Sequence, residues 1–389
     1  MNNTINIKKL TPVLMAFFAM GIVDLVGIAT NYIKVDFKLS DTYANLFTSM
    51  VFLWFLIFSI PTGLLMNKIG RKNTVVISLV LTFFALIVPF IDYNLTTILV
   101  SFTLIGIGNT LMQVSLNPLL SNIVSEDKLA SKLTLGQFIK AIAAFIAPII
   151  AAWSLIKFGD WKLLFGFYAI ISLVCGVYLY LTKIPEQPII GKATSFKDCF
   201  KLFEDKYILL LFVGILVHVG IDVGVNTTGP KLLIERCGLQ LADAGYVTSI
   251  YFVFRTVGCF MGTFILSRFS SLKFFIISVI MLSIGVVGLY FSYSTLAIYI
   301  CVSILGFGNS NVFSIIFSKA LQQLPNRNNE ISGLMITGIF GGALFIVAMG
   351  FTSDFMGGQI GAVVILTLCI AYLAFLVTRI KKFEKTESN

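Results

Sequence analysis

Long apolar segments constrain this chain more than any other feature. A helix needs about 20 apolar residues to cross the hydrocarbon core of a bilayer, and runs of that length recur throughout the sequence. With 58% hydrophobic and only 12% charged residues, the chain has more apolar surface than a soluble core could bury. We therefore expect an all-α membrane protein with about twelve transmembrane helices, near residues 10–33, 44–66, 74–92, 96–123, 133–156, 161–182, 207–234, 243–266, 273–292, 295–322, 331–352 and 358–379.

The distribution of positive charge predicts the orientation of these helices. Twenty of the 28 Lys and Arg residues lie at the N-terminus, in the even-numbered loops or in the C-terminal tail, and six lie in the odd-numbered loops. The other two, Lys140 and Arg255, lie inside segments. This positive-inside bias predicts that both termini lie in the cytoplasm. We expect a multi-pass protein of a bacterial inner membrane. Because this distribution accounts for the net charge of +10, we expect no nucleic-acid partner.

A polar stripe on the fourth segment is repeated later in the chain. Asn109, Gln113 and Asn117 are four residues apart, so they fall on one face of an otherwise apolar helix. The spacing of Gly106, Gly108 and Asn109 recurs two hundred residues later in the run GFGNSN. A duplicated polar stripe at membrane depth is typical of a pathway lined by two related halves.

The repeat predicts three parts of the chain. We expect an N-terminal six-helix bundle over residues 1–183 and a C-terminal six-helix bundle with a short cytoplasmic tail over residues 206–389. The linker, 184–205, holds two prolines and a charged amphipathic run that is typical of a helix on the membrane surface.

Charged and amide side chains inside the first half are candidate site residues. Asp24 lies near mid-depth on helix one, with Asn31 about two turns later on the same side. An ionised carboxylate at the centre of a helix costs roughly 2.5–3.5 kcal/mol, so Asp24 should face the bundle interior, as part of an ion pair or as a proton carrier. Gln137 and Lys140 lie one turn apart on helix five. Lys140 either neutralises Asp24 or meets an anionic group on a substrate.

The second half repeats this arrangement. His218, Asp222 and Asn226 lie four residues apart on one face of helix seven, and Arg255 is the intramembrane Arg of helix eight. His218 is either a hydrogen-bonded packing residue or part of a proton relay with Asp222. Asp222 and Arg255 form the second expected acid–base pair, and protonation of either intramembrane Asp would release its basic partner.

The loop between helices two and three, GLLMNKIGRKN, resembles the signature loop of the major facilitator superfamily. Gly63 would permit a close helix approach and Gly70 a tight turn, whereas Asn67 occupies the position of the family's acid. The basic residues of this candidate gating loop are Lys68, Arg71 and Lys72.

A narrower resemblance follows from GIVDLVG in helix one, the FKLS after it, SIPTGLLMNK in helix two, QVSLNP in helix four and the Gln137 region. These runs resemble the fucose/galactose/glucose:proton symporters. The resemblance implies twelve helices in two pseudo-symmetric six-helix bundles (the major facilitator fold), alternating access, and a sugar bound between the bundles. It also implies that Gln137 helps to hold sugar hydroxyls. The family's helix-one carboxylate would fall at Ile28, one turn after Asp24, and Gln113 replaces the helix-four acid of some members.

We therefore expect a secondary transporter that imports a sugar by proton symport, with an acidic sugar such as sialic acid or a hexuronate as one refinement. The alternatives are a neutral hexose or deoxyhexose symporter and a drug or metabolite exporter. The exporter is disfavoured because helix five lacks the glycine-rich GP motif of antiporters. The proton-coupling candidates are Asp24, Asp222 and His218. The substrate-binding candidates are Asn31, Asn109, Gln113, Asn117, Gln137, Lys140, Asn226, Arg255, Asn309 and Asn311.

The sequence gives no sign of an enzyme. HExxH, Ser/His/Asp and phosphate-cradling patterns are absent, so we expect no catalytic residues, no metal and no cofactor. The six cysteines are scattered without metal-binding spacing and are interpreted as packing residues. The expected partners are a small sugar, a proton or alternatively sodium, and the lipid bilayer, with the monomer as the working unit.

Overall fold

The computed structural model of the chain describes residues 7–39, 41–186, 196–239 and 241–387, and within these ranges all regular structure is helical. Eleven helices of the described chain are long and apolar enough to cross a membrane. The first predicted segment supplies the twelfth span as α1 (Ile7–Met20), a 3₁₀ turn (Gly21–Asp24) and α2 (Leu25–Asp36). The prediction of an all-α membrane protein with twelve helical spans is thereby confirmed.

Helix one is interrupted by a 3₁₀ turn, and a side chain of another helix contacts its backbone at the break. The side-chain amide of Asn109 donates to the carbonyl oxygen of Met20, at 2.8 Å. A Cβ atom on Gly21 would lie 2.5 Å from the carbonyl oxygen of Lys140, so only glycine lets the turn pack this closely on α6. The two pieces have 14 and 12 residues, and neither is long enough to span a bilayer alone.

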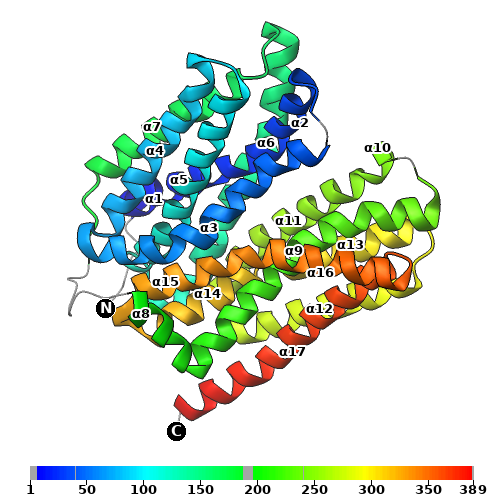
Figure 1. Cartoon of the computed structure of the whole chain (residues 1–389). Helices are drawn as coiled ribbons and strands as arrows, with labels where there is room; N and C mark the ends of the chain where they lie inside the picture. Colours follow the sequence, from blue (N-terminus) through cyan, green and yellow to red (C-terminus); the bar gives the residue numbers. More distant parts are fainter. Residues whose placement is uncertain (1–6, 40, 187–195, 240, 388–389) are drawn as a thin grey trace. The chain divides into compact units, whose positions relative to one another are not determined.

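The first of two compact units comprises residues up to Phe203 together with Leu321–Thr337. Within it α4 packs against α5 and α7, α3 packs against α5, and α1 packs against α6 and α7 (Figure 1). The helices that follow α2 in this unit are α3 (Asp41–Ile69), α4 (Arg71–Ile91), α5 (Leu95–Ser121), α6 (Glu126–Phe158), α7 (Leu163–Leu181), α8 (Phe196–Phe200) and α15 (Asn328–Thr337).

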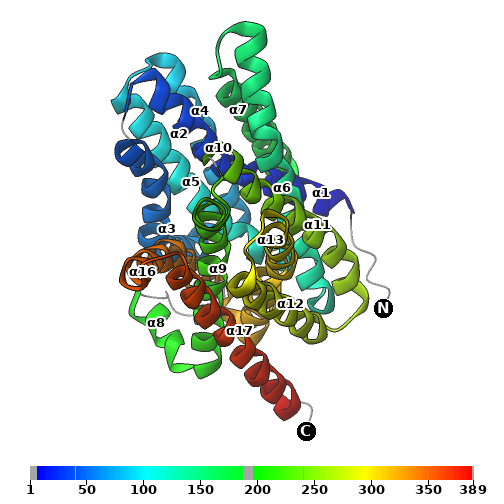
Figure 2. The ribbon, with the colours of Figure 1, turned by 90° about the vertical axis from the view of Figure 1, so that its right-hand side faces the viewer.

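The second unit comprises Glu204–Ala320 and Gly338–Asn389. In it α9 packs against α16 and α17, and α12 packs against α13 and α17 (Figure 2). The helices are α9 (Lys206–Cys237), α10 (Leu241–Ala244), α11 (Tyr246–Arg268), α12 (Ser271–Phe291), α13 (Thr295–Asn309), α14 (Val312–Gln323, whose last residues belong to the first unit), α16 (Gly341–Met356) and α17 (Ile360–Glu387).

The tenth span is also interrupted. Ser310 and Asn311 separate α13 from α14, and the Asn311 amide donates to the carbonyl oxygen of Gly258 at 3.0 Å. A Cβ atom on Gly262 would overlap the Asn311 carboxamide, so the glycines of α11 make room for this turn. The interruption places Asn309 at the end of α13.

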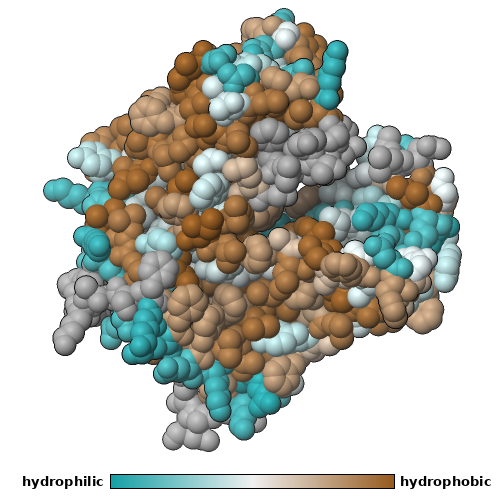
Figure 3. Space-filling view, in the orientation of Figure 1, coloured by the Kyte–Doolittle hydropathy of each residue, from teal (hydrophilic) through white to brown (hydrophobic). Residues whose placement is uncertain are grey.

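Large apolar side chains remain exposed along the helices. Hydrophobic residues cover much of the face in Figure 3, and the exposed side chains include Phe84 on α4, Val174 on α7, Ile284 on α12 and Leu368 on α17. Exposed apolar surface of this extent is expected where the solvent is lipid.

Two glycines of α16 provide a matched test of its packing on α9. A Cβ atom at Gly341 would overlap the carbonyl oxygen of Leu216, two residues before His218, whereas a Cβ atom at Gly350 meets nothing within 4 Å. We expect Gly341→Ala to destabilise the protein by about 1–3 kcal/mol. Gly350→Ala should be neutral or stabilise it by about 0.5–1 kcal/mol, because alanine favours helix. Thermal unfolding in detergent measures both, and equal midpoints for the two variants would contradict this account of the packing.

Candidate functional site

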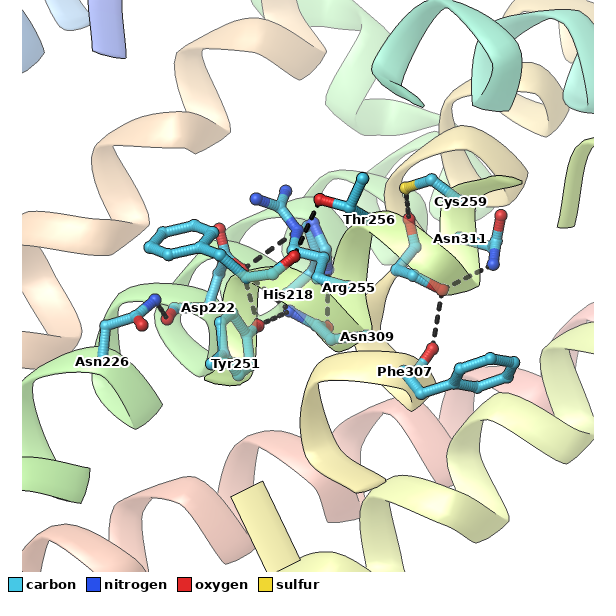
Figure 4. A network of polar contacts seen from close by, with 12 residues as sticks. His218, Asp222, Asn226, Tyr251, Arg255, Thr256, Cys259, Phe307, Asn309 and Asn311 are labelled. Atoms are coloured by element: carbon cyan, nitrogen blue, oxygen red, sulfur yellow. Dashed lines mark hydrogen bonds and ion pairs between the residues drawn. The ribbon is translucent and has the colours of Figure 1, made fainter. Parts of the chain in front are cut away.

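Four side chains singled out in the second half, His218, Asp222, Arg255 and Asn309, meet in one network that is completed by Tyr251 (Figure 4). His218 and Asp222 project from α9, Tyr251 and Arg255 from α11, and Asn309 is the last residue of α13. His218, Tyr251 and Asn309 are buried, while Asp222 and Arg255 keep 18% and 28% of their side-chain surface exposed.

Within this network, every contact to the Asp222 carboxylate is made to one of its oxygens, Oδ1. The Tyr251 hydroxyl donates to Oδ1 at 2.6 Å, and the Asn309 amide donates to it at 3.4 Å. The Arg255 Nε atom lies 3.3 Å from the same oxygen and forms an ion pair with it. The expected pairing of Asp222 with Arg255 is therefore present. An unpaired carboxylate at membrane depth is costly, and Arg255 balances its charge.

Asn309 lies between His218 and Asp222. The Asn309 carbonyl oxygen is 2.8 Å from His218 Nδ1, and its amide nitrogen is 3.0 Å from the Tyr251 hydroxyl. With the carboxamide in this orientation, Nδ1 carries the proton and donates it to Asn309. Because a carboxamide passes protons poorly, this geometry favours hydrogen-bonded packing of His218 over a direct relay to Asp222.

Two other amides expected here take no direct part in the network. The Asn226 amide donates to the backbone oxygen of Asp222 at 2.7 Å, and its own side-chain oxygen is buried without a hydrogen-bond partner among the described residues. Asn311 bonds to Gly258 and Ser310 at the turn between α13 and α14. Asn311 therefore has a structural contact rather than a place beside Asp222.

The amide stripe of α5 is present, but it is buried. Gln113 donates to the Asn109 carboxamide oxygen at 2.7 Å, and Asn117 donates to the Gln113 backbone oxygen at 2.8 Å. All three side chains have at most 7% of their surface exposed. In this conformation they bond to one another and to Met20, so they offer little surface to a ligand.

The Asp24–Lys140 ion pair expected as one alternative is not formed. Asp24 ends the 3₁₀ turn with an exposed side chain and makes no ion pair or hydrogen bond with the described residues. Lys140 brings its backbone oxygen against this turn at Gly21, whereas its partly buried ammonium has no described anionic partner. Gln137, one turn earlier, is also partly buried. The side chain of Asn31 lies outside the described residues.

At the far end of α3, the candidate gating loop obtains a carboxylate from a distant residue. The Asn67 amide donates to Glu330 Oε1 at 2.8 Å, and its oxygen accepts from the Asn329 amide at 2.6 Å. A Cβ atom on Gly63 would lie 2.7 Å from the Asn329 backbone oxygen, and one on Gly333 would lie 2.7 Å from Ser59. Close packing of α3 and α15 thus places Glu330 beside the position where the family has its acid.

The basic residues of this loop have different roles. Buried Arg71 donates to the Asn329 side chain at 2.6 Å, to the Pro118 carbonyl at 3.2 Å and to Asn122. Lys72 donates to the Tyr180 carbonyl at 2.8 Å, and Lys68 is exposed. Gly70 has a positive φ of 87°.

Glu186 caps the start of α4 by accepting from the backbone N–H groups of Arg71 and Lys72, at 3.0 and 2.7 Å. A carboxylate at a helix N-terminus is favourable, so the first residues of the predicted linker anchor this loop.

Two residues of these sites were missed by the sequence reasoning. Tyr251 precedes Arg255 by four residues, so it lies on the same face of α11, and this spacing was the available signal. Glu330 is separated from Asn67 by 263 residues, and no local pattern links them.

The buried charges and amides within these long apolar helices define a polytopic membrane protein with polar sites inside its helical units. The chain matches the Major Facilitator Superfamily over residues 13–347. It belongs to that superfamily.

Known proteins support the narrower resemblance. The glucose/galactose transporter of Brucella abortus is 25% identical, covering 94% of this chain and 92% of its own length. A putative glucose/galactose transporter of Helicobacter pylori is 24% identical, covering 100% and 99%. Among solved structures, the transporter FucP in the outward conformation has a TM-score of 0.82 at 20% identity, covering 95% of this chain and 97% of its own.

The Asn67–Glu330 contact predicts that stability depends on a single carboxylate at this position, whichever of the two residues carries it. Asn67→Asp would place two carboxylates side by side at a largely buried position, and like charges there are destabilising. We expect Asn67→Asp to lower the unfolding midpoint, and Asn67→Asp with Glu330→Gln to restore most of the loss. Detergent thermal shift measures the three proteins, with Asn73→Asp on the exposed side of α4 as the control. A double variant no more stable than Asn67→Asp would contradict the contact.

The Asp222–Arg255 pair predicts non-additive effects on stability. Either Asp222→Asn or Arg255→Gln leaves one charge without its partner and should cost about 1–3 kcal/mol. The double variant removes both charges and should be more stable than the sum of the two losses implies. A double-mutant cycle of unfolding free energies tests this, and strict additivity would show that the pair is not coupled.

Proposed function

We propose that this protein is a secondary transporter that imports a sugar by proton symport through alternating access. The observation that carries the proposal is the network around Asp222, since an ion pair and a buried histidine are retained within membrane-length helices. Ionisable groups at such depth are expensive and mark ion or substrate pathways by default. Relatives named glucose/galactose transporter, which align over almost the whole chain, support the substrate class.

We propose a neutral hexose as the leading substrate. Arg255 is already neutralised by Asp222, which leaves no need for an anionic group on the substrate at this position. Partly exposed Gln137 would bind sugar hydroxyls, because its carboxamide offers donors and an acceptor at fixed geometry. Asn226 would join it if a side-chain rotation released its amide from the Asp222 backbone and exposed its buried oxygen. The buried amides of α5 and α13 would support the site by holding neighbouring backbone and side chains.

The proton would be carried by an intramembrane carboxylate, Asp24 or Asp222, and His218 would tune the latter through Asn309. The loop from Gly63 to Lys72 would take part in gating through its contacts with α15. We propose two six-helix bundles, residues 1–183 and 206–389, joined by the linker 184–205. The protein would lie in a bacterial inner membrane with both termini in the cytoplasm, as the positive-inside bias favours.

An acidic sugar is a second candidate substrate, and Lys140 favours it. Lys140 lies on α6, is partly buried and has no described anionic partner. A substrate carboxylate could therefore neutralise its ammonium group.

Uptake by purified protein in liposomes tests the proposed function and separates the two substrates. We expect an inward proton gradient to drive accumulation of a neutral hexose, and a protonophore to abolish it. Lys140→Asn should leave neutral-hexose uptake within about twofold but would abolish uptake of an acidic sugar if that were the substrate. Accumulation driven by sodium alone would contradict proton coupling, and no uptake of any sugar would contradict the substrate class.

A further inference from the structure

The two oxygens of Asp222 have different surroundings. Oδ1 receives Tyr251 and Asn309 and lies beside Arg255. Oδ2 accepts no hydrogen bond from the described residues. The Asp222 side chain as a whole keeps 18% of its surface exposed. Among the described residues, one oxygen of Asp222 is therefore contacted by three side chains and the other by none.

Tyr251 fixes this orientation. Its side chain is fully buried, and its hydroxyl donates to Asp222 while it accepts from Asn309 (Figure 4). The Asn309 carboxamide is held in turn by His218. The two oxygens are chemically equivalent, so a half-turn of the carboxylate would only exchange which of them accepts from the phenol. The hydrogen-bonded chain from His218 to Asp222 therefore holds one carboxylate oxygen and sets the direction of the other, which is Oδ2 in this structure.

Within the described residues, the internal repeat shows this arrangement in the second unit and not in the first. A Cβ atom on Gly306 would lie 2.6 Å from the backbone oxygen of Tyr251, and one on Gly106, at the matching position of the repeat, would lie 2.6 Å from the Trp54 side chain and 3.2 Å from the Cα atom of Val51. The matching glycines are 200 residues apart, which is also the separation of Val51 from Tyr251. Val51 therefore corresponds to Tyr251, and Phe55, one turn later, corresponds to Arg255. Both residues of α3 are buried and apolar. The first unit thus has no phenol and no guanidinium at these positions, and Asp24 has neither kind of contact there.

We propose that Asp222 Oδ2 accepts a hydrogen bond from a hydroxyl of the transported sugar, and that Tyr251 is the positioning residue that presents it. This inference rests on the proposed function and deepens it. A carboxylate with one oxygen fixed is an acceptor of defined direction, and a hydrogen bond to a charged acceptor is stronger than one between neutral groups. Asp222 then keeps its charge and its pairing with Arg255 during transport, and the proton is carried elsewhere. The free anionic oxygen also favours a neutral sugar over an acidic one.

Sugars that lack one hydroxyl at a time test the proposal by counterflow in liposomes, which measures exchange without a proton gradient. For the wild type, we expect one monodeoxy hexose to bind at least about 10-fold more weakly than the parent hexose. The Asp222→Asn variant should bind the parent hexose more weakly than the wild type does, by the same factor. Its affinity for the same deoxy sugar should differ from its affinity for the parent hexose by less than about twofold.

Tyr251→Phe removes only the phenol oxygen and provides the second variant. We expect a raised half-saturation constant for the parent hexose, reduced discrimination against the same deoxy sugar, and a maximal exchange rate within about threefold of the wild type. Tyr168→Phe is the matched control, since Tyr168 is equally buried but donates to the carbonyl oxygen of Ala143 at 2.6 Å, in the other unit. It should keep wild-type discrimination.

The outcomes separate this inference from the proposed function. If the wild type exchanges no sugar, the proposed function fails. If the wild type exchanges hexose and Asp222→Asn retains the wild-type discrimination, Asp222 contacts no hydroxyl and the inference is overturned. An Asp222→Asn protein with normal counterflow that loses only uphill accumulation would identify Asp222 as the proton carrier and would also overturn it.

Discussion

A polar group at membrane depth must find its partner within the protein, because the hydrocarbon around the helices offers none. The second unit meets this requirement with five side chains from three helices, in which the Asp222 carboxylate is approached by a phenol, an amide and a guanidinium. Since each helix contributes at least one group, the network depends on the packing of α9, α11 and α13. The glycines of α11 and α13 permit this packing, because Gly258 faces Ser310 and Gly306 faces the Tyr251 backbone.

The two halves of the repeat make different polar contacts at matching positions. Asn109 and Asn309 occupy matching positions, but Asn109 bonds to a backbone carbonyl of helix one and to Gln113 of its own helix, whereas Asn309 bonds to three side chains of two other helices. In the first unit Asp24 is exposed and has no ion-pair or hydrogen-bond partner among the described residues, whereas in the second unit Asp222 is paired with Arg255 and oriented by Tyr251. A transporter that couples a sugar to a proton needs one group that binds hydroxyls and another that changes its protonation. A duplicated fold can assign these tasks to different halves.

Hydropathy was sufficient to predict the fold, since a membrane-length apolar segment has few alternatives to a spanning helix. The interruptions were not predictable, because they depend on contacts across the fold, such as that of Asn109 with Met20. For the site, the four-residue spacing of His218 and Asp222 correctly indicated one helix face. Pairing of Asp24 with Lys140 was an equally reasonable expectation, but α6 presents the Lys140 backbone to the turn. Glu330 could not be assigned from sequence, because its partner lies far along the chain.

The interruption of helix one has a consequence for the order of assembly. Neither α1 nor α2 is long enough to cross the hydrocarbon core alone, so the first span includes the 3₁₀ turn between them. Lipid offers no donor that could replace the Asn109 side chain at the Met20 carbonyl. Asn109 lies 89 residues after Met20, so helix one acquires this contact only after a later helix has been synthesised.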